Sequence, residues 1–279
     1  MAVKPHIQMS SASVPLVHEV EILDEAGRKK LTHIPGERPL TIYLDRREVV
    51  TLMTLGSAPE ALVLGYLRNQ RLVESPDDIE SIQVDWETDS AAVKTRRSTV
   101  DIDALTSKRV VTTGCGQGTM FGGLMEEMAE TRLPDGPNLS QEAIVALIDA
   151  IRVHDSIYKK SGSVHACAVF ERVGDSDVEM LYFIEDVGRH NAVDSISGLM
   201  WLADKSGKDL IFFTTGRLTS EMVIKGAQMG VPFLLTRSGV TLMGLELARK
   251  TNLTILSRCS GKHFEIYNAP ERVIFTQNR

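Results

Sequence analysis

The chain has few cysteines, and none of them form a close pair. Its 279 residues include only Cys115, Cys167 and Cys259, and there is no Cys-x-x-Cys motif. Three scattered cysteines do not build a disulfide framework, and without such a motif no structural zinc site is expected. Zinc-dependent deamination is also disfavoured, because Cys167 stands where that chemistry needs a glutamate after His165. A redox or structural thiol protein has no paired cysteines to support it.

Several other signatures are missing. No apolar run approaches the roughly 20 residues that span a bilayer, and Met1–Ser13 lacks the apolar region of a secretory signal. We therefore expect a cytoplasmic protein. Neither a phosphate-binding P-loop nor a G-x-G-x-x-G dinucleotide fingerprint occurs. The net charge of −6 gives no sign of nucleic-acid binding, so an anionic ligand would need a local cluster of basic residues.

The first third of the chain has the pattern of an α+β domain. Apolar and polar residues alternate over residues 17–23 and 40–55, which predicts strands. A serine followed by an early proline predicts a capped helix over residues 57–68, with Ser57 as the cap. A hairpin is expected between residues 79 and 97. The sequence therefore predicts a small N-terminal α+β domain over residues 14–113.

Residues 114–137 separate this domain from the rest of the chain. The segment is rich in glycine and proline and has no apolar periodicity of its own. Such a stretch is typical of a loop between domains, and we predict a mobile segment that carries Cys115.

Strands and helices alternate from residue 138 onward. Ser140 is expected to cap an amphipathic helix that ends at Lys159–Gly162. An antiparallel pair of strands is predicted at Val164–Phe170 and Val178–Ile184. Strands at 209–215, 231–237 and 253–259 are then separated by helices at 219–229 and 241–250. This alternation predicts an α/β domain over residues 138–279, with a mostly parallel sheet covered by helices in three layers.

A dense polar motif follows the strand that ends at Ile184. Residues 185–194 are Glu-Asp-Val-Gly-Arg-His-Asn-Ala-Val-Asp, and five of the ten are ionisable. A strand-to-helix turn capped by an aspartate or an asparagine would explain one of them. Five in ten positions favour an interlocked polar network at a functional site. We predict that Asp186, Arg189 and His190 belong to this site.

The three predicted parallel strands end in hydroxyl and guanidinium groups. These ends carry Arg217, Arg237 and the turn Arg258–Lys262, and the first two are followed by helix N-termini. Because open parallel sheets bind ligands outside the carboxyl ends of their strands, these groups would meet in one crevice. Guanidinium forks and helix N-termini suit a phosphate or pyrophosphate. The competing interpretation is three solvated loops, but three arginines in register favour an anion site.

The cysteines differ in their surroundings. Cys115 lies between two glycines, so its sulfur would be accessible, as a nucleophilic or sulfur-carrying cysteine requires. The alternative is an ordinary loop cysteine. Cys167 lies in a predicted strand and is expected to be buried and inert. His165 on the same strand is either a core histidine or a site residue, and Cys259 is expected to line the anion pocket.

Taken together, these motifs resemble those of the formate dehydrogenase accessory sulfurtransferases, the FdhD/NarQ family. The resemblance rests on residues 185–194 and on four further stretches in the same order and spacing, and it covers nearly the whole chain from about Leu16 onward. Those four stretches are Thr112–Gly116, Ser163–Ala166, Thr215–Val223 and Leu253–Tyr267.

The resemblance implies a cytidine-deaminase-like fold for the C-terminal domain and a sulfur-carrying function. The position of Cys115 matches the family's persulfide-forming cysteine, which takes sulfur from a cysteine desulfurase. The bound substrate would be the molybdenum cofactor bis-molybdopterin guanine dinucleotide. The client enzyme would be formate dehydrogenase, and the protein would be a homodimer. The expected cofactor-binding residues are Arg258, Cys259, Ser260, Gly261, Lys262 and His263, with Arg217, Arg237, His165, Asp186, Arg189 and His190.

One departure from the family pattern bears on the mechanism. Many members have Cys-x-x-Cys at this loop, whereas this chain has Cys115-Gly116-Gln117-Gly118. A disulfide within the loop is therefore excluded, although a persulfide needs only one sulfur. The missing thiol keeps a second hypothesis open, a cofactor chaperone that binds and inserts the molybdenum cofactor without sulfur transfer.

Overall fold

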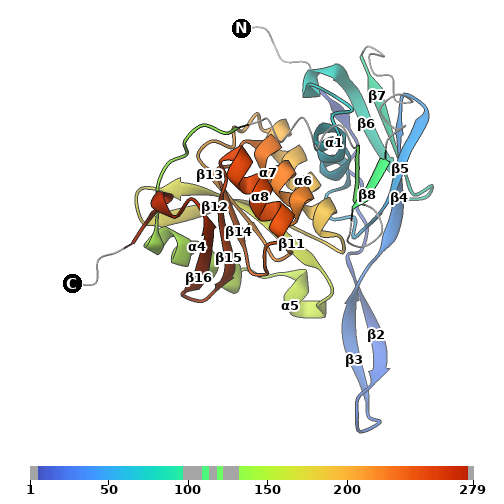
Figure 1. Ribbon diagram of the computed structural model, residues 1–279. Coiled ribbons are helices and arrows are strands. Elements are labelled where there is room, and N and C mark those ends of the chain that lie inside the picture. Colours follow the sequence, from blue (N-terminus) through green and yellow to red (C-terminus); the bar gives the residue numbers. More distant parts are fainter. Residues whose placement is uncertain (1–5, 97–108, 113–117, 122–131, 276–279) are drawn as a thin grey trace.

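Two large sheets organise the chain in the computed structural model (Figure 1). The structure describes residues 6–96, 109–112, 118–121 and 132–275, with side chains given for the first and last of these ranges. Cys115 lies outside the described residues, so the predicted mobility around it and the predicted domain boundaries stay predictions. Within the described part of the chain, no helix is long and apolar enough to cross a membrane.

The N-terminal sheet has five strands in the order β1-β6-β7-β4-β5. Strands β4 and β5 form one hairpin, β6 and β7 form the expected second hairpin, and β7 joins the two by parallel pairing with β4. Helix α1 (Pro59–Asn69) packs its apolar residues against this sheet. The strands are β1 (Gln8–Met9), β4 (Arg38–Leu44), β5 (Arg47–Thr54), β6 (Ile79–Asp85) and β7 (Ser90–Thr95), with a 3-10 helix at Pro76–Asp78.

Two further hairpins lie outside the large sheets. Strands β2 (Val17–Leu23) and β3 (Lys29–Pro35) form a two-stranded ribbon that projects away from the body (Figure 1). Strand β8 (Arg109–Thr112) pairs with β9 (Gly118–Phe121), so that Thr112 lies opposite Gly118. Strand β9 falls within the segment for which the sequence predicts a loop, and its pairing with β8 gives these four residues regular structure.

The C-terminal sheet has six strands in the order β12-β11-β13-β14-β15-β16. Strands β13, β14 and β15 are parallel, and β11 and β12 form the expected antiparallel pair. The prediction of a mostly parallel sheet is right for the centre only, because β11 and β16 each run antiparallel to their central neighbours. The strands are β11 (His165–Val173), β12 (Asp177–Asp186), β13 (Leu210–Thr214), β14 (Phe233–Thr236), β15 (Thr254–Ser260) and β16 (His263–Asn268).

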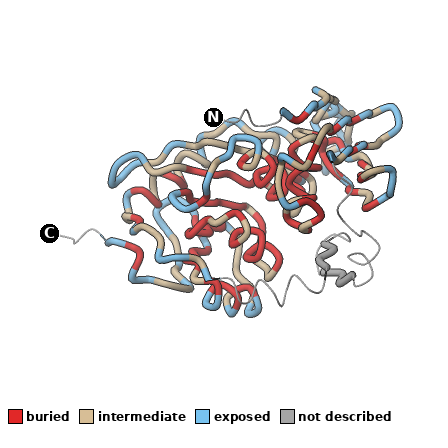
Figure 2. Tube along the Cα trace, turned by 90° about the horizontal axis from the view of Figure 1, so that it is seen from above, coloured by how far each residue is buried: buried red, intermediate tan, exposed pale blue. Residues whose placement is uncertain are grey.

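Helices cover both faces of this sheet, which gives the predicted three layers. Alternate residues of β11 separate the two cores: Cys167 and Val169 pack with the helices of one face, and Ala168 and Phe170 pack with α4 on the other. Figure 2 shows the buried residues gathered in the interior of the molecule, with exposed residues toward its outside. The covering helices are α4 (Gln141–Val153) on one face and α6 (Arg189–Leu202), α7 (Ser220–Met229) and α8 (Leu242–Thr251) on the other.

The predicted helix from Ser140 to Lys160 is two helices, α4 and α5 (Ile157–Ser161). The hydroxyl of Ser140 caps α4 as expected. A new helix starts at Ile157 because the carboxylate of Glu185 accepts two backbone N–H groups there. This acceptor comes from a strand far along the chain, whereas the hydroxyl of Ser156, which caps α5 by accepting the N–H of Lys159, is a local signal that the sequence prediction did not use. A short strand pair, β10 (Leu139–Ser140) with β17 (Val273–Ile274), and a 3-10 helix at Pro270–Arg272 complete the fold.

Helix α1 packs directly on α6 and joins the two large sheets into one body. A Cβ atom placed on Gly65 would lie 1.7 Å from the backbone oxygen of Asp194, and one on Gly198 would lie 2.0 Å from the backbone oxygen of Ala61. The two helices therefore approach to backbone contact at a pair of glycines. Ser57 does not cap α1 as predicted; its hydroxyl donates to the backbone oxygen of Glu185 and adds a second tie across the junction.

Candidate functional site

The carboxyl ends of β13, β14 and β15 meet at one edge of the C-terminal sheet, and a cavity of about 220 Å³ lies there. Thr215, Arg237 and the Cys259–Gly261 turn line it from the three strand ends. The cavity is on the α4 and α5 face, where Ile148 and Phe213 form its apolar side. The structure thus brings several residues of the predicted anion site to one pocket.

The polar lining of this cavity is mainly basic. Arg152 and Lys159 come from α4 and α5, and Arg237 comes from the end of β14. The guanidinium of Arg237 lies over the ring of Tyr158, 5.2 Å from its centroid. Glu185 also lines the cavity, but its carboxylate accepts the backbone N–H groups at the start of α5. Three cations and an aromatic ring suit an anionic ligand with a planar group.

Cys259 lines this pocket as a buried group and not as a nucleophile. The residue is 1% exposed, and burial raises the pKa of its thiol to about 12. Burial likewise raises the pKa of Cys167 to about 12, and that residue is fully buried. Because the thiolate is the reactive form, neither sulfur is suited to nucleophilic chemistry near neutral pH. The expectation that Cys167 is buried is confirmed.

The remaining residues of the predicted cofactor-binding turn lie on the rim. Ser260 pairs with His263 where β15 turns into β16, and Gly261 has the left-handed φ of 58° that this turn requires. Lys262 and His263 are exposed. Arg258 is also exposed, has a φ of 55°, and its guanidinium lies close to Gly239 in the loop after β14.

The hydroxyl groups at the strand ends are less available than the sequence predicts. Thr214 and Thr236 are completely buried. Both bind the backbone of Gly216: the Thr214 hydroxyl accepts its N–H, and the Thr236 hydroxyl donates to its C=O. These hydroxyls therefore hold the loop after β13 in place, and the exposed polar groups of this edge include Arg237, Arg258, Ser260 and Lys262.

The polar motif at the end of β12 divides between the two faces of the sheet. Glu185 pairs with Ala166 and faces the cavity, whereas Asp186 pairs with His165 and faces α6. The two oxygens of Asp186 accept hydrogen bonds from Thr54, Leu55, Gly188 and Asn191. Asp186 is 2% exposed, and these bonds tie the end of β5 to the start of α6. Its predicted role in cofactor binding stays a prediction, and its observed contacts are structural.

His165, Arg189, His190 and Arg217 form a basic group on the α6 side of the same edge. The aliphatic part of Arg189 covers Gly216, leaving no room for a side chain there. Partial burial, together with Arg189 and Arg217, lowers the pKa of His165. Arg217 is exposed and is not among the residues that line the cavity.

Burial lowers the pKa of His190 to about 3, which keeps the imidazole neutral. Its Nε2 atom lies 3.1 Å from a carboxylate oxygen of Glu221. That carboxylate favours the protonated form, but Lys225, Arg189 and His165 oppose it. Burial and the neighbouring basic groups lower the pKa of His190 by more than the single carboxylate of Glu221 raises it, because the loss of hydration destabilises the charged imidazolium more than one ion pair stabilises it.

A buried ionic network extends from His190 into the interior. The Nζ atom of Lys225 lies 2.9 Å from Asp194 and 3.2 Å from Glu221, and all three side chains are at most 3% exposed. Asp194 also accepts a hydrogen bond from Asn69 at the end of α1. The polar motif of residues 185–194 includes Asp194, whereas Glu221 and Lys225 were not predicted to belong to a site. Their signal is a pair of opposite charges four residues apart on a helix that has no other charged residue.

Comparisons with known proteins agree with this architecture. The family model of the FdhD/NarQ family matches residues 35–274, which is most of the chain. The chain belongs to the FdhD/NarQ family. A crystal structure of a candidate formate dehydrogenase accessory protein from Desulfotalea psychrophila superposes with a TM-score of 0.73. The two are 25% identical, and the match covers 93% of this chain and all of that one, which confirms the predicted fold class.

Three curated relatives share one name. The sulfur carrier protein FdhD of Bacillus pumilus is 28% identical over 245 residues, which is 88% of this chain and 91% of the relative. The sulfur carrier protein FdhD of Listeria monocytogenes is 28% identical over 242 residues, with 86% and 91% covered. The protein of the same name from Staphylococcus aureus is 26% identical over 240 residues, with 85% and 88% covered.

Proposed function

We propose that this protein is a sulfur carrier in which Cys115 transports sulfane sulfur as a persulfide. The donor is the persulfide of a cysteine desulfurase. The Cys115 thiolate attacks the outer sulfur of that persulfide, a new S–S bond forms on Cys115, the donor S–S bond breaks, and the donor cysteine leaves as a thiolate. The carrier then delivers the sulfur to bis-molybdopterin guanine dinucleotide, the substrate of the reaction: the substrate supplies the electron pair for the new bond to sulfur, the S–S bond on Cys115 breaks, and Cys115 is released as a thiolate. The product serves the maturation of formate dehydrogenase.

The observation that carries this proposal is the state of the other two cysteines. The chain has three in all, and Cys167 and Cys259 are buried with the pKa of each thiol raised to about 12. Sulfur transfer needs an accessible thiolate, so Cys115 is left as the candidate. Family membership and the name of the curated relatives support the same function.

The cavity at the strand ends is the proposed seat of the substrate. Arg152, Lys159 and Arg237 supply positive charge for a phosphate or pyrophosphate, and Tyr158 offers a ring edge or face to a planar base. The turn from Arg258 to His263 forms the rim beside it. At about 220 Å³ the cavity suits one portion of the cofactor, such as a guanine nucleotide, and not the whole molecule.

The alternative function is a cofactor chaperone that binds and inserts the molybdenum cofactor without sulfur chemistry. It is favoured by one feature, Gly118 in place of a second loop thiol. In either case we propose a homodimer in the cytoplasm with a cysteine desulfurase or a formate dehydrogenase as partner.

Mass spectrometry separates the two functions. The full chain is incubated with a cysteine desulfurase and cysteine, and the intact mass is measured before and after reduction. A sulfur carrier gains one sulfur atom that dithiothreitol removes, the Cys115→Ala variant gains none, and Cys259→Ala serves as the matched control that still gains it. Absence of the adduct on the native chain would rule out the carrier and favour the chaperone.

A further inference from the structure

Helix α5 forms one wall of the cavity at the strand ends, although it has only five residues. Two of them, Tyr158 and Lys159, line the cavity. None of the five is buried, so core packing contributes little to the position of this helix. A helix of this length is not stable by itself in water, because so few hydrogen bonds do not offset the cost of nucleation. Contacts with the rest of the protein must therefore hold α5 in place.

The carboxylate of Glu185 holds the start of α5. Its Oε2 atom accepts the N–H of Ile157 at 2.5 Å, and its Oε1 atom accepts the N–H of Tyr158 at 3.0 Å. The hydroxyl of Ser156 accepts the next N–H, that of Lys159, at 3.3 Å. Hydrogen bonds to an ionised acceptor are roughly twice as strong as neutral ones, so Glu185 contributes more than the local cap does.

Glu185 is itself held firmly. It is 6% exposed and lies in β12, where it pairs with Ala166 of β11. Its backbone oxygen accepts a hydrogen bond from the hydroxyl of Ser57, which precedes α1. Because the sheet and the N-terminal part of the chain both fix this residue, its carboxylate gives α5 a rigid point of attachment.

This attachment reaches the cations of the cavity through Tyr158. Glu185 binds the backbone of Tyr158, and the guanidinium of Arg237 lies over the ring of Tyr158, 5.2 Å from its centroid. The next residue, Lys159, is another cation of the cavity lining. A shift of α5 would therefore displace Lys159 and remove the surface on which Arg237 rests.

We propose that Glu185 is a positioning residue of this cavity. Its carboxylate acts through α5 to place Tyr158 and Lys159 and, through the ring of Tyr158, Arg237. This role rests on the proposed function, because the group to be bound is the guanine nucleotide portion of the substrate. Both carboxylate oxygens already bind α5, so Glu185 acts without contacting the ligand.

The positioning role and a direct electrostatic role predict opposite effects of Glu185→Gln. A carboxylate that only faced the cavity would repel a phosphate, and its removal would tighten binding. A positioning carboxylate is replaced poorly by an amide, because glutamine has one acceptor oxygen for two N–H groups and turns its NH₂ group toward the second. The loss of this bond loosens α5, so the binding of an anion becomes weaker.

Calorimetric titration of the full chain with GDP measures the sign of this effect. Glu185→Gln is expected to weaken binding by roughly fivefold or more, since at least one bond to the start of α5 is lost. Glu179→Gln is the matched control. It removes an exposed carboxylate from the same strand, outside the cavity lining, and should change the affinity by less than about twofold. In a Tyr158→Ala background Glu185→Gln should have a smaller effect than in the native chain, because one route of its action is gone.

Amide hydrogen exchange tests the same role without a ligand. The amides of Ile157 and Tyr158 are bound to Glu185 in the native chain, and in Glu185→Gln at least one of them should exchange faster. Amides of β13 and β14 should exchange at the native rate, which separates a loosened α5 from a loss of overall stability. Unchanged exchange at both α5 amides would overturn the proposal.

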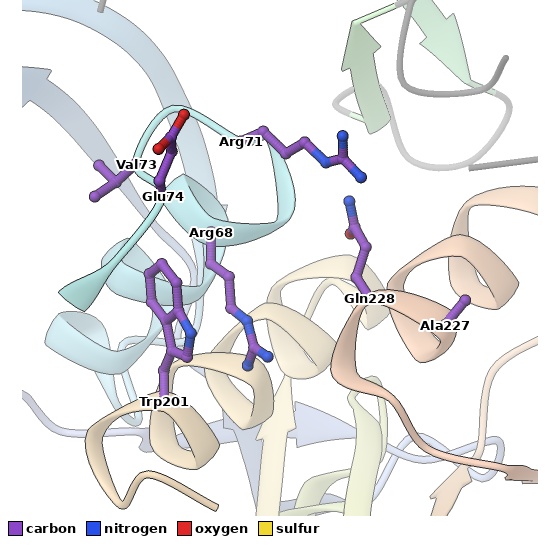
Figure 3. A pocket seen from close by; sticks show the side chains of 7 residues that line it. All are labelled: Arg68, Arg71, Val73, Glu74, Trp201, Ala227 and Gln228. Atoms are coloured by element: carbon purple, nitrogen blue, oxygen red, sulfur yellow. The ribbon is translucent and has the colours of Figure 1, made fainter. Parts of the chain in front are cut away.

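A second groove, of about 510 Å³, gives a control on where GDP binds. It lies between the ends of α1, α6 and α7, where the guanidinium of Arg68 lies over the ring of Trp201, 5.1 Å from its centroid (Figure 3). The groove shares no lining residue with the cavity, and neither Trp201 nor the other tryptophan, Trp86, lines that cavity. In a chain labelled with 5-fluorotryptophan, both ¹⁹F resonances should therefore stay in place as GDP is added.

The outcomes separate this role from the function on which it rests. Equal or tighter GDP binding in Glu185→Gln, with normal binding by the native chain, would overturn the positioning role and leave the proposed function standing. A Trp201 resonance that shifts with the titration, or a native chain that binds no GDP, would overturn the proposed seat of the substrate and the role of Glu185 in it.

Discussion

At the edge of the C-terminal sheet where the parallel strands end, the charged residues on one face are mostly buried and the basic ones around the cavity on the other face are exposed. On the α6 and α7 side, Asp194, Glu221 and Lys225 are buried and contact one another, and Asp186 is enclosed by four hydrogen bonds. On the α4 and α5 side, Arg152, Lys159 and Arg237 are exposed around an open cavity. Buried charges that pair with one another hold the fold together, whereas the exposed cations at the cavity are accessible to a ligand, and one of them, Arg152, also pairs with Asp149.

This difference changes the meaning of the most polar motif in the sequence. Five ionisable residues in ten positions suggest a single site, but Glu185 faces the cavity while Asp186 and Asp194 face the helices. The motif therefore does two tasks. It positions one carboxylate at the pocket, and it fastens the N-terminal sheet to the C-terminal one.

The largest expected effect comes from the glycine contact beneath the buried network. In Gly65→Ala the new methyl group would meet the backbone of α6, which cannot move without displacing Asp194. We expect a loss of at least about 3 kcal/mol in the free energy of unfolding, since overpacking against backbone is poorly relieved. Urea denaturation measures it. Gly239→Ala is the control, because its methyl group would make ordinary contacts, and it should change stability by less than about 0.5 kcal/mol.

The ionic network gives an effect of similar size and compares the two faces of the sheet directly. Lys225→Met leaves two buried carboxylates without their cation and should cost about 3–5 kcal/mol of unfolding free energy. Lys159→Met removes an exposed cation at the cavity and should cost less than about 0.5 kcal/mol. Chemical denaturation measures the unfolding free energy of both variants. Similar losses in the two would contradict the view that only the α6 and α7 face depends on buried charges.

His190 makes stability depend on pH. The unfolded chain protonates this imidazole below pH 6.5, whereas the folded chain does so only near pH 3. Between these values the unfolded state binds more protons, so stability is complete above pH 6.5 and falls as the pH is lowered. The slope contributed by this group is at most about 1.4 kcal/mol per pH unit. Denaturation midpoints of His190→Gln against the native chain from pH 7 to pH 4 should differ in slope; parallel curves would contradict the assignment.

The smallest effect concerns ligand binding and leaves stability unchanged. If the cavity holds a guanine nucleotide, Arg237→Ala should weaken GDP binding by roughly tenfold or more through loss of a charge-assisted contact. Arg217→Ala, which removes an exposed arginine outside the cavity lining, should weaken it by less than about threefold. Calorimetric titration of GDP compares the two. A larger loss of GDP affinity in Arg217→Ala than in Arg237→Ala would indicate that the nucleotide binds on the α6 side of the sheet.

Much of the fold was predictable because its signals are local. The apolar runs of β13, β14 and β15 and the periodic helices between them appear within a few residues of their predicted places. The convergence of Arg237 and the Cys259–Gly261 turn followed from the rule that parallel strands end at one edge.

The features that were not predicted from the sequence involve contacts between residues that are distant along the chain. The carboxylate of Glu185 that binds the start of α5 comes from β12, in addition to the local cap Ser156, and the contact of Gly65 with α6 joins two helices that share no local pattern. Lys225 has a local partner in Glu221, but its other carboxylate, Asp194, belongs to α6, and the burial of the pair follows only from the packing of the two helices. Packing geometry decides all three, and no short window of residues contains it.

The placement of Glu185 and Asp186 on opposite faces of β12 has a consequence for how this protein can evolve. Side chains alternate along a strand, so inserting or deleting one residue before this pair would exchange the two carboxylates. Glu185 would enter the helix interface and Asp186 the cavity, and both tasks would fail at once. Substitutions can explore this strand one side chain at a time, whereas a change of length after the β-bulge at Leu181 would move both carboxylates to the wrong face. We therefore expect the length of β12 between Tyr182 and Asp186 to vary less among relatives than the residues within it.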